Sequence, residues 1–271
     1  MSPWLETAGA VVLGVAGICF ARWLSLSPKR HWLGAWLVSL GVVLLYGAPR
    51  YIRGLEFVPP FSWVAANRVQ FVLFPLIIPA LLLTPAAKLR GTRVRALLAV
   101  LAGLALLKFS VFPALFPALN HNLLLHLKTK IDRDGVCLQG TGYTCGPAAA
   151  VTALRQLGLP AEEGEIAVWA RTTSVAGTPP DVLAQTLRDH FGLQGVTARL
   201  RYFKTFPELK QAGLTIAVVK YNSMEDHYVT VLSATETNLV VGDPLNGRVT
   251  YTEDDFAKIW RYSGVVLGRR P

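Results

Sequence analysis

Residues 139–150 read Gln-Gly-Thr-Gly-Tyr-Thr-Cys-Gly-Pro-Ala-Ala-Ala, which is the pattern of a short glycine loop that runs into a helix. Pro147 is a favoured residue in the first turn of a helix. Residues 148–157 are rich in Ala, Leu, Arg and Gln, which are strong helix formers, and Gly158 can end the helix. The stretch therefore predicts that Cys145 lies at a helix N-terminus.

This position suits a nucleophilic cysteine. The partial positive charge of a helix N-terminus favours the thiolate, which is the reactive form of the side chain. Gln139 lies one short loop upstream, so its side-chain amide is a candidate donor to an oxyanion in acyl transfer. A small, buried and inert cysteine is the alternative that fits the same stretch.

A base and its orienting group are predicted downstream. Of the two histidines after Cys145, His190 ends a helical run, where a basic residue is common, whereas His227 opens the apolar strand 227–232. A second strand, 238–242, ends at Asp243. If the two strands are antiparallel neighbours, both side chains lie at one edge of a sheet. The expected triad is therefore Cys145, His227 and Asp243.

Four motifs in this order resemble a known family: Gln139, Cys145-Gly146, His227-Tyr228-Val229 and Asp243-Pro244. They are similar to those of the papain-like bacteriocin-processing peptidases, which cut after double-glycine leaders. The resemblance covers residues 130–271, about half of the chain. It implies a papain-like fold, a cysteine peptidase activity without a cofactor, and a peptide or protein substrate with small residues such as Gly-Gly before the cut.

The resemblance also implies a role for each residue. Cys145 is the nucleophile, His227 the general base, Asp243 its orienter, and Gln139 the oxyanion donor. Thr144 stands where the family usually has an acidic residue. No ATP-binding cassette follows in the sequence, so a separate export machinery is an expected partner.

The N-terminal half has a membrane composition. Hydrophobic residues make up 52% of the chain and the net charge is +10. All of that excess lies in residues 1–128, with 12 Lys and Arg against 2 Asp and Glu, whereas residues 129–271 carry 15 of each sign. Because the excess lies in loops between apolar segments, it indicates membrane topology and argues against nucleic-acid binding.

Four apolar segments predict four transmembrane helices, at about 7–26, 32–46, 61–83 and 94–116. The expected domains are a four-helix transmembrane domain over 1–118, an interfacial linker helix over 119–130, and a peptidase domain over 131–271. The fold class is therefore a membrane α-helical half, which resides in a lipid bilayer, plus an α+β papain-like domain.

The remaining polar residues are given structural roles. Arg68 and Lys108 are expected to extend from their spans to a nearby interface. His121 and His126 are spaced five apart, which is unsuitable for a shared metal on one helix face, and no metal site is predicted. Cys19 and Cys137 are expected to be packing residues.

The basic loops predict orientation. Arg22, Lys29 and Arg30 lie between the first two spans, and four basic residues fall within 88–95, between the last two. Loops rich in Lys and Arg stay in the cytoplasm. The expected protein is therefore a multi-pass protein of the bacterial inner membrane with its peptidase domain outside the cytoplasm.

Alternatives remain for the C-terminal half. It is either a leader-binding module that has lost activity, another Cys-dependent acyl transferase or amidase, or the regulatory part of a transporter or scaffold.

Helices are expected at 148–157, 162–171, 181–190, 206–212 and 252–260. Strands are expected at 197–202, 215–221, 227–234, 238–242, 248–251 and 264–268.

Overall fold

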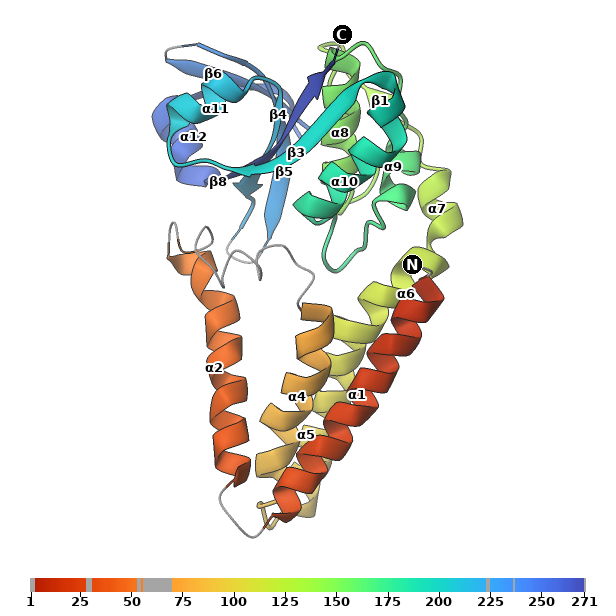
Figure 1. Cartoon of the computed structure of the whole chain (residues 1–271), viewed down its shortest axis with the longest axis vertical. Helices are drawn as coiled ribbons and strands as arrows, with labels where there is room; N and C mark the ends of the chain where they lie inside the picture. Colours follow the sequence, from red (N-terminus) through yellow and green to blue (C-terminus); the bar gives the residue numbers. More distant parts are fainter. Residues whose placement is uncertain are drawn as a thin grey trace. The chain divides into compact units, whose positions relative to one another are not determined.

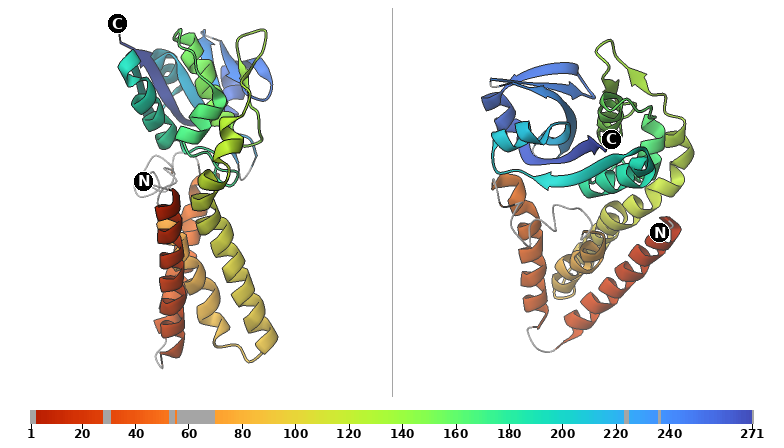
Figure 2. Two further views of the ribbon diagram at one scale, coloured as in Figure 1. Left: turned by 90° about the vertical axis from the view of Figure 1, so that its right-hand side faces the viewer. Right: turned by 45° about the horizontal axis from the view of Figure 1, so that its top comes forward.

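The computed structural model describes residues 3–27, 31–52, 55, 70–222, 225–235 and 237–270. Two compact units divide the chain, Met1–Leu119 and Asn120–Pro271 (Figure 1). The first is helical, and the second combines helices with a sheet, as Figure 2 shows from two further directions.

The first unit consists of apolar helices. They are α1 (Pro3–Leu26), α2 (His31–Tyr51), α4 (Gln70–Ala86), α5 (Thr92–Leu106), the π-helix η2 (Leu107–Val111) and α6 (Phe112–Leu119). Among the described residues, three helical stretches are long and apolar enough to cross a membrane: Trp4–Leu26, His31–Ala48 and Thr92–Leu119. Three of the four predicted spans therefore have a candidate helix among the described residues. The described apolar part of the other segment, Leu73–Ala86, is shorter than a span, and its predicted residues 61–69, with Arg68, lie outside the described range.

Small residues let α1 approach α4 closely. A Cβ atom on Gly17 would overlap the Pro75 carbonyl, so only glycine fits there. This is the close packing that small residues permit between membrane helices. Lys108 lies in the π-helical turn with its Nζ 5.5 Å from the centre of the Phe109 ring.

The second unit begins with a short helix and a two-stranded hairpin. Helix α7 (His121–Leu125) is followed by β1 (Lys130–Ile131), which pairs antiparallel with β2 (Cys137–Leu138). The linker helix predicted over 119–130 is therefore only five residues long here, because the chain extends to pair Lys130 with Leu138.

The remaining elements follow the predicted order. The helices are α8 (Cys145–Gln156), α9 (Glu163–Trp169), α10 (Pro180–Phe191), the 3-10 turn η3 (Gly192–Gln194), α11 (Phe206–Ala212) and α12 (Glu253–Ile259). The strands are β3 (Val196–Tyr202), β4 (Thr215–Lys220), β5 (Asp226–Ala234), β6 (Asn238–Asp243), β7 (Gly247–Thr252) and β8 (Trp260–Arg269). The Thr252 hydroxyl accepts from the Asp255 N–H and so caps the start of α12.

Six strands form one antiparallel sheet in the order β3-β8-β4-β5-β6-β7. Helices α8 and α10 pack on one face with the larger hydrophobic cluster, and α11 and α12 cover the other (Figure 1). Helix α8 is the central element, since every residue from Cys145 to Leu154 is buried. Its Ala-rich sequence lets it lie close against β5, and this places its N-terminus beside the sheet edge.

Candidate active site

Cys145 is the first residue of α8, as the sequence predicts. Its residue is 9% exposed, so the thiol is enclosed but reachable. The preceding residue, Thr144, holds the loop before the helix: its hydroxyl accepts from the Thr141 N–H at 3.1 Å and donates to the Thr141 carbonyl at 3.2 Å. The loop that leads to Cys145 is therefore closed on itself.

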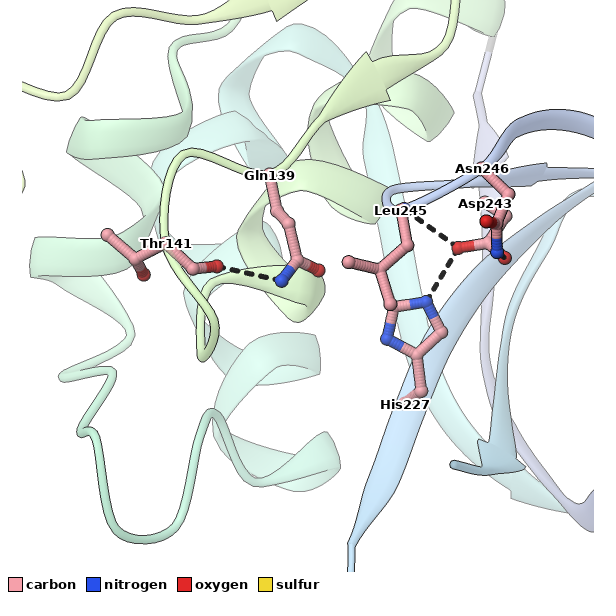
Figure 3. Close-up of polar contacts among 6 residues, drawn as sticks. All are labelled: Gln139, Thr141, His227, Asp243, Leu245 and Asn246. Carbon is pink, nitrogen blue, oxygen red and sulfur yellow. Dashed lines mark hydrogen bonds and ion pairs between the residues drawn. The ribbon is translucent and has the colours of Figure 1, made fainter. Parts of the chain in front are cut away.

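His227 and Asp243 form a buried pair. His227 Nε2 lies 2.7 Å from Asp243 Oδ1, and the two residues are 6% and 4% exposed. The Leu245 N–H donates to Oδ1 at 2.9 Å and Asn246 Nδ2 donates to Oδ2 at 2.7 Å (Figure 3). Burial raises the pKa of Asp243, but the His227 hydrogen bond and these two donors lower it below its usual value. Asp243 is therefore a fixed carboxylate.

His227 connects Asp243 with Cys145. Burial lowers the pKa of His227, but hydrogen bonds to Asp243 and Cys145 and the negative charge of both raise it to about 9. Because Nε2 is taken by Asp243, Nδ1 is the ring nitrogen left for the Cys145 thiol. The arrangement favours a protonated imidazole that is hydrogen-bonded on both sides.

Gln139 lies on the loop across from His227 (Figure 3). Its Nε2 donates to the Thr141 carbonyl at 2.8 Å, while its Oε1 is buried without a hydrogen-bond partner among the described residues. An amide nitrogen carries two N–H bonds, so one remains for a further acceptor. The backbone of Gln139 donates to the Pro244 carbonyl at 2.9 Å, which ties it to the turn after Asp243.

Two contacts between helix and sheet fix these residues relative to one another. The Thr230 hydroxyl donates to the Ala149 carbonyl at 2.8 Å, which joins β5 to α8. Tyr228 packs beside Gly146 and donates its hydroxyl to the Thr178 carbonyl at 2.7 Å. The structure thus brings Cys145, His227 and Asp243 together and ties the Gln139 backbone to the turn after Asp243.

Other residues of this site were not predicted from the sequence. Asn246 lies just after the predicted strand 238–242, and Thr230 lies within the predicted apolar strand 227–232. Neither residue is part of a recognisable sequence motif. Thr230 acts on a partner distant in sequence, and Asn246 acts through the geometry of the turn after Asp243. An asparagine three residues after a predicted orienting Asp was the one available signal.

The remaining cysteines and histidines give no metal site. Cys19, Cys137 and Cys145 are all free, and no group of three metal-ligating side chains occurs in the residues the structure describes. Burial and the nearby Glu163 raise the pKa of Cys137 to about 12, so it remains a neutral thiol. Its N–H donates to the Thr152 hydroxyl at 2.9 Å, which matches the expected packing role.

Comparison with known proteins gives relatives for this half. An uncharacterized protein of Methanothermobacter marburgensis is 30% identical over 143 residues, covering 53% of this chain and 94% of that protein. An uncharacterized protein of Methanothermobacter thermautotrophicus is 29% identical over the same length, with the same coverage.

Two solved structures are similar at low scores. One is a double glycine motif protease from an AMS/PCAT transporter in complex with the leader peptide, with a TM-score of 0.42, 16% identity and coverage of 53% and 94% of the two chains. The other is the peptidase domain of Streptococcus ComA, a bifunctional ABC transporter involved in a quorum sensing pathway. Its TM-score is 0.43 at 16% identity, with coverage of 54% and 100%.

A family model decides the assignment. The model of the Peptidase C39 family matches residues 133–271, just over half of the chain. The match includes the glycine loop, Cys145, His227 and Asp243. The resemblance stated from the sequence is therefore confirmed, and the chain belongs to the Peptidase C39 family.

Proposed function

We propose that this chain is a membrane-bound cysteine peptidase that cleaves peptides or leader sequences after small residues such as Gly-Gly. The observation that carries the proposal is the position of His227, held between the Asp243 carboxylate and the Cys145 thiol. A nucleophile, a base and an orienting carboxylate in this order are what acyl transfer by a cysteine requires.

The mechanism follows from these positions. The Cys145 thiolate attacks the carbonyl carbon of the scissile peptide bond. His227 gives its proton to the leaving amine as the C–N bond breaks, which leaves a thioester on Cys145. Water then attacks the thioester while His227 takes its proton, and this releases the carboxylate product and restores the thiolate.

Oxyanion stabilisation is assigned to two donors. The free N–H of the Gln139 amide is one, and the backbone N–H of Cys145 is the other, because the first N–H groups of a helix have no acceptor within the helix. Asp243 keeps the imidazole in one orientation and stabilises its positive charge, supported by Leu245 and Asn246.

The apolar helices of the first unit support a membrane location. We propose that they anchor the peptidase where substrate peptides reach the bilayer, with a separate export machinery as partner. We propose that the peptidase unit lies outside the cytoplasm, because the basic loops at 22–30 and 88–95 favour the cytoplasmic side. The double-glycine preference rests on the family resemblance.

Labelling and cleavage together test the proposal. Full-length protein in detergent is treated with iodoacetamide and with peptides that contain a Gly-Gly sequence. We expect Cys145→Ala to lose cleavage and the labelling at position 145, read by peptide mass mapping, and Cys137→Ala to keep both, because the Cys137 thiol stays protonated. Cleavage by Cys145→Ala would refute the peptidase assignment. Binding of the peptides by the native protein without cleavage would identify it as a leader-binding module instead.

A further inference from the structure

Glu163 is a buried carboxylate that the proposed mechanism does not use. It is the first residue of α9 and is 0% exposed. Its Oε1 accepts from the Gly140 N–H at 2.8 Å, and its Oε2 is buried without a hydrogen-bond partner among the described residues. A buried carboxyl group with an unsatisfied oxygen is costly to keep. Its position therefore calls for an explanation beyond packing.

The carboxylate is bonded to the loop between the oxyanion donor and the nucleophile at its Gly140 end. Gly140, which it holds, directly follows Gln139. Burial raises the pKa of Glu163, while the Gly140 N–H and then the hydroxyl of Thr144, the residue before Cys145, lower it. Gln139 and Thr144 are themselves bonded to Thr141 within the loop. Glu163 Oε1 therefore fixes the Gly140 end of the loop, and the two bonds to Thr141 are internal to the loop.

Glu163 also contacts the N-terminal segment of the second unit, residues 120–130. The Glu163 N–H donates to the Thr129 hydroxyl at 2.8 Å. A Cβ atom on Gly164 would overlap the Leu124 carbonyl, so α9 lies directly against α7. A Cβ atom on Gly140 would lie 3.2 Å from a methyl carbon of Leu127. The segment 120–130 thus packs against both Glu163 and the loop.

We propose that Glu163 is a positioning residue for oxyanion stabilisation: by bonding the Gly140 N–H, it holds the amide of Gln139 in place and braces the loop against residues 120–130. This inference rests on the proposed peptidase function. In this proposal Glu163 does not contact the substrate, and it affects the reaction only through the position of Gln139.

The physical argument is one of precision. An oxyanion donor is effective only when it lies at hydrogen-bond distance from the developing charge, and a misplacement of about 1 Å can cost on the order of 100-fold in rate. Without Glu163 Oε1, the Gly140 N–H loses its protein acceptor, and the loop is no longer tied to α9 at this point. The positions of His227, Asp243 and the start of α8 are held by β5, β6 and α8 through other contacts.

Two probes separate these effects in the full-length protein. A peptide aldehyde ending in Gly-Gly forms a tetrahedral hemithioacetal with Cys145, whose oxygen needs the oxyanion donors. Iodoacetamide alkylates the same thiolate by displacement of iodide and needs none. The variants are Glu163→Ala, Glu163→Gln, Gln139→Ala and the double variant of Glu163→Ala with Gln139→Ala. The matched control is Glu165→Ala, which removes an exposed carboxylate from the same helix.

We expect Glu163→Ala to weaken aldehyde binding by about 10- to 100-fold while the alkylation rate stays within about threefold. Glu163→Gln retains an oxygen for the Gly140 N–H and stays close to the native protein. The double variant is no weaker than Gln139→Ala, because residues that act as a unit are not additive. Glu165→Ala changes neither measurement.

Several results would overturn the inference. Glu163→Ala with unchanged aldehyde binding, or with alkylation reduced as much as aldehyde binding, would reject a positioning role through Gln139. Additive losses of aldehyde binding in the double variant would also reject it. If Glu163→Ala does not fold, the isosteric Glu163→Gln is measured instead. A loss of aldehyde binding in Glu163→Gln as large as that of Gln139→Ala rejects the positioning role. A native protein that is alkylated at Cys145 but binds no aldehyde would instead refute the proposed function itself.

Discussion

His227 and Asp243 are diagonal neighbours in the sheet, and their side chains still meet at 2.7 Å. Thr230 of β5 pairs with Gly242 of β6, so the register places Asp243 level with Val229, two residues from His227. Diagonal positions on one face of a sheet lie within reach of long side chains. The pair therefore depends on the register, since a slip of one residue would turn one side chain to the other face.

The activity should depend on pH through this pair. Because the pKa of His227 is raised to about 9, the imidazolium is lost as the pH rises through that value, and kcat/KM for a Gly-Gly peptide should fall there. Asp243→Asn removes the charge that supports the imidazolium, so the fall should move to lower pH and kcat should drop at least about tenfold. A fall at the same pH in native protein and variant would show that another group titrates.

Stability should follow the same titration. The folded-state pKa of about 9 lies above the ordinary value of 6.5, so protonated His227 stabilises the native state fully below pH 6.5. That contribution is lost as the pH rises towards 9. Urea unfolding of the Cys145-containing unit should therefore show a lower midpoint at pH 9.5 than at pH 6. His227→Gln should flatten this difference, and an undiminished difference would assign it to other groups.

The Gln139 amide should matter to turnover more than to binding. Loss of one oxyanion donor costs about 100- to 1000-fold in kcat. We expect Gln139→Ala to show this loss with KM little changed, measured by steady-state cleavage of a Gly-Gly peptide. A collapse of binding with normal turnover per bound peptide would make Gln139 a specificity residue.

The sequence pattern was sufficient for the local elements of this site and insufficient for its supports. Pro147 and the helix-forming residues after it placed Cys145 at the start of a helix, and two apolar runs placed His227 and Asp243 on adjoining strands. Each of these follows from neighbours in sequence. Glu163 acts on Gly140 across 23 residues and Thr230 on Ala149 across 81, and no local pattern encodes such contacts.

The buried Thr152 hydroxyl should contribute to the stability of the peptidase unit. It accepts from the Cys137 N–H at 2.9 Å and donates to the Ala148 carbonyl at 3.2 Å. Thr152→Val keeps the shape but leaves a buried N–H without an acceptor, which costs about 1–3 kcal/mol. The thermal unfolding midpoint should fall accordingly. Thr197→Val, at a half-buried threonine of β3, should have a smaller effect.

The basic loops make a prediction of topology that a reporter can check. Alkaline phosphatase fused after Pro271 should be active if the C-terminal half lies outside the cytoplasm, as the Lys and Arg residues of 22–30 and 88–95 indicate. A fluorescent protein at the same position should then stay dark in an exported fusion. The reverse pair of results would place the peptidase unit in the cytoplasm.

The close approach of Gly164 to the Leu124 carbonyl decides where the peptidase unit can be separated from the rest of the chain. A soluble fragment beginning at Asn120 retains helix α7 and the Thr129 hydroxyl that accepts the Glu163 N–H. A fragment beginning at Ile131 would lose both. The start of α9, which contacts the loop before Cys145 through Glu163, would then be exposed to water. A fragment in which these contacts stay covered must therefore include helix α7, which precedes the first strand, β1.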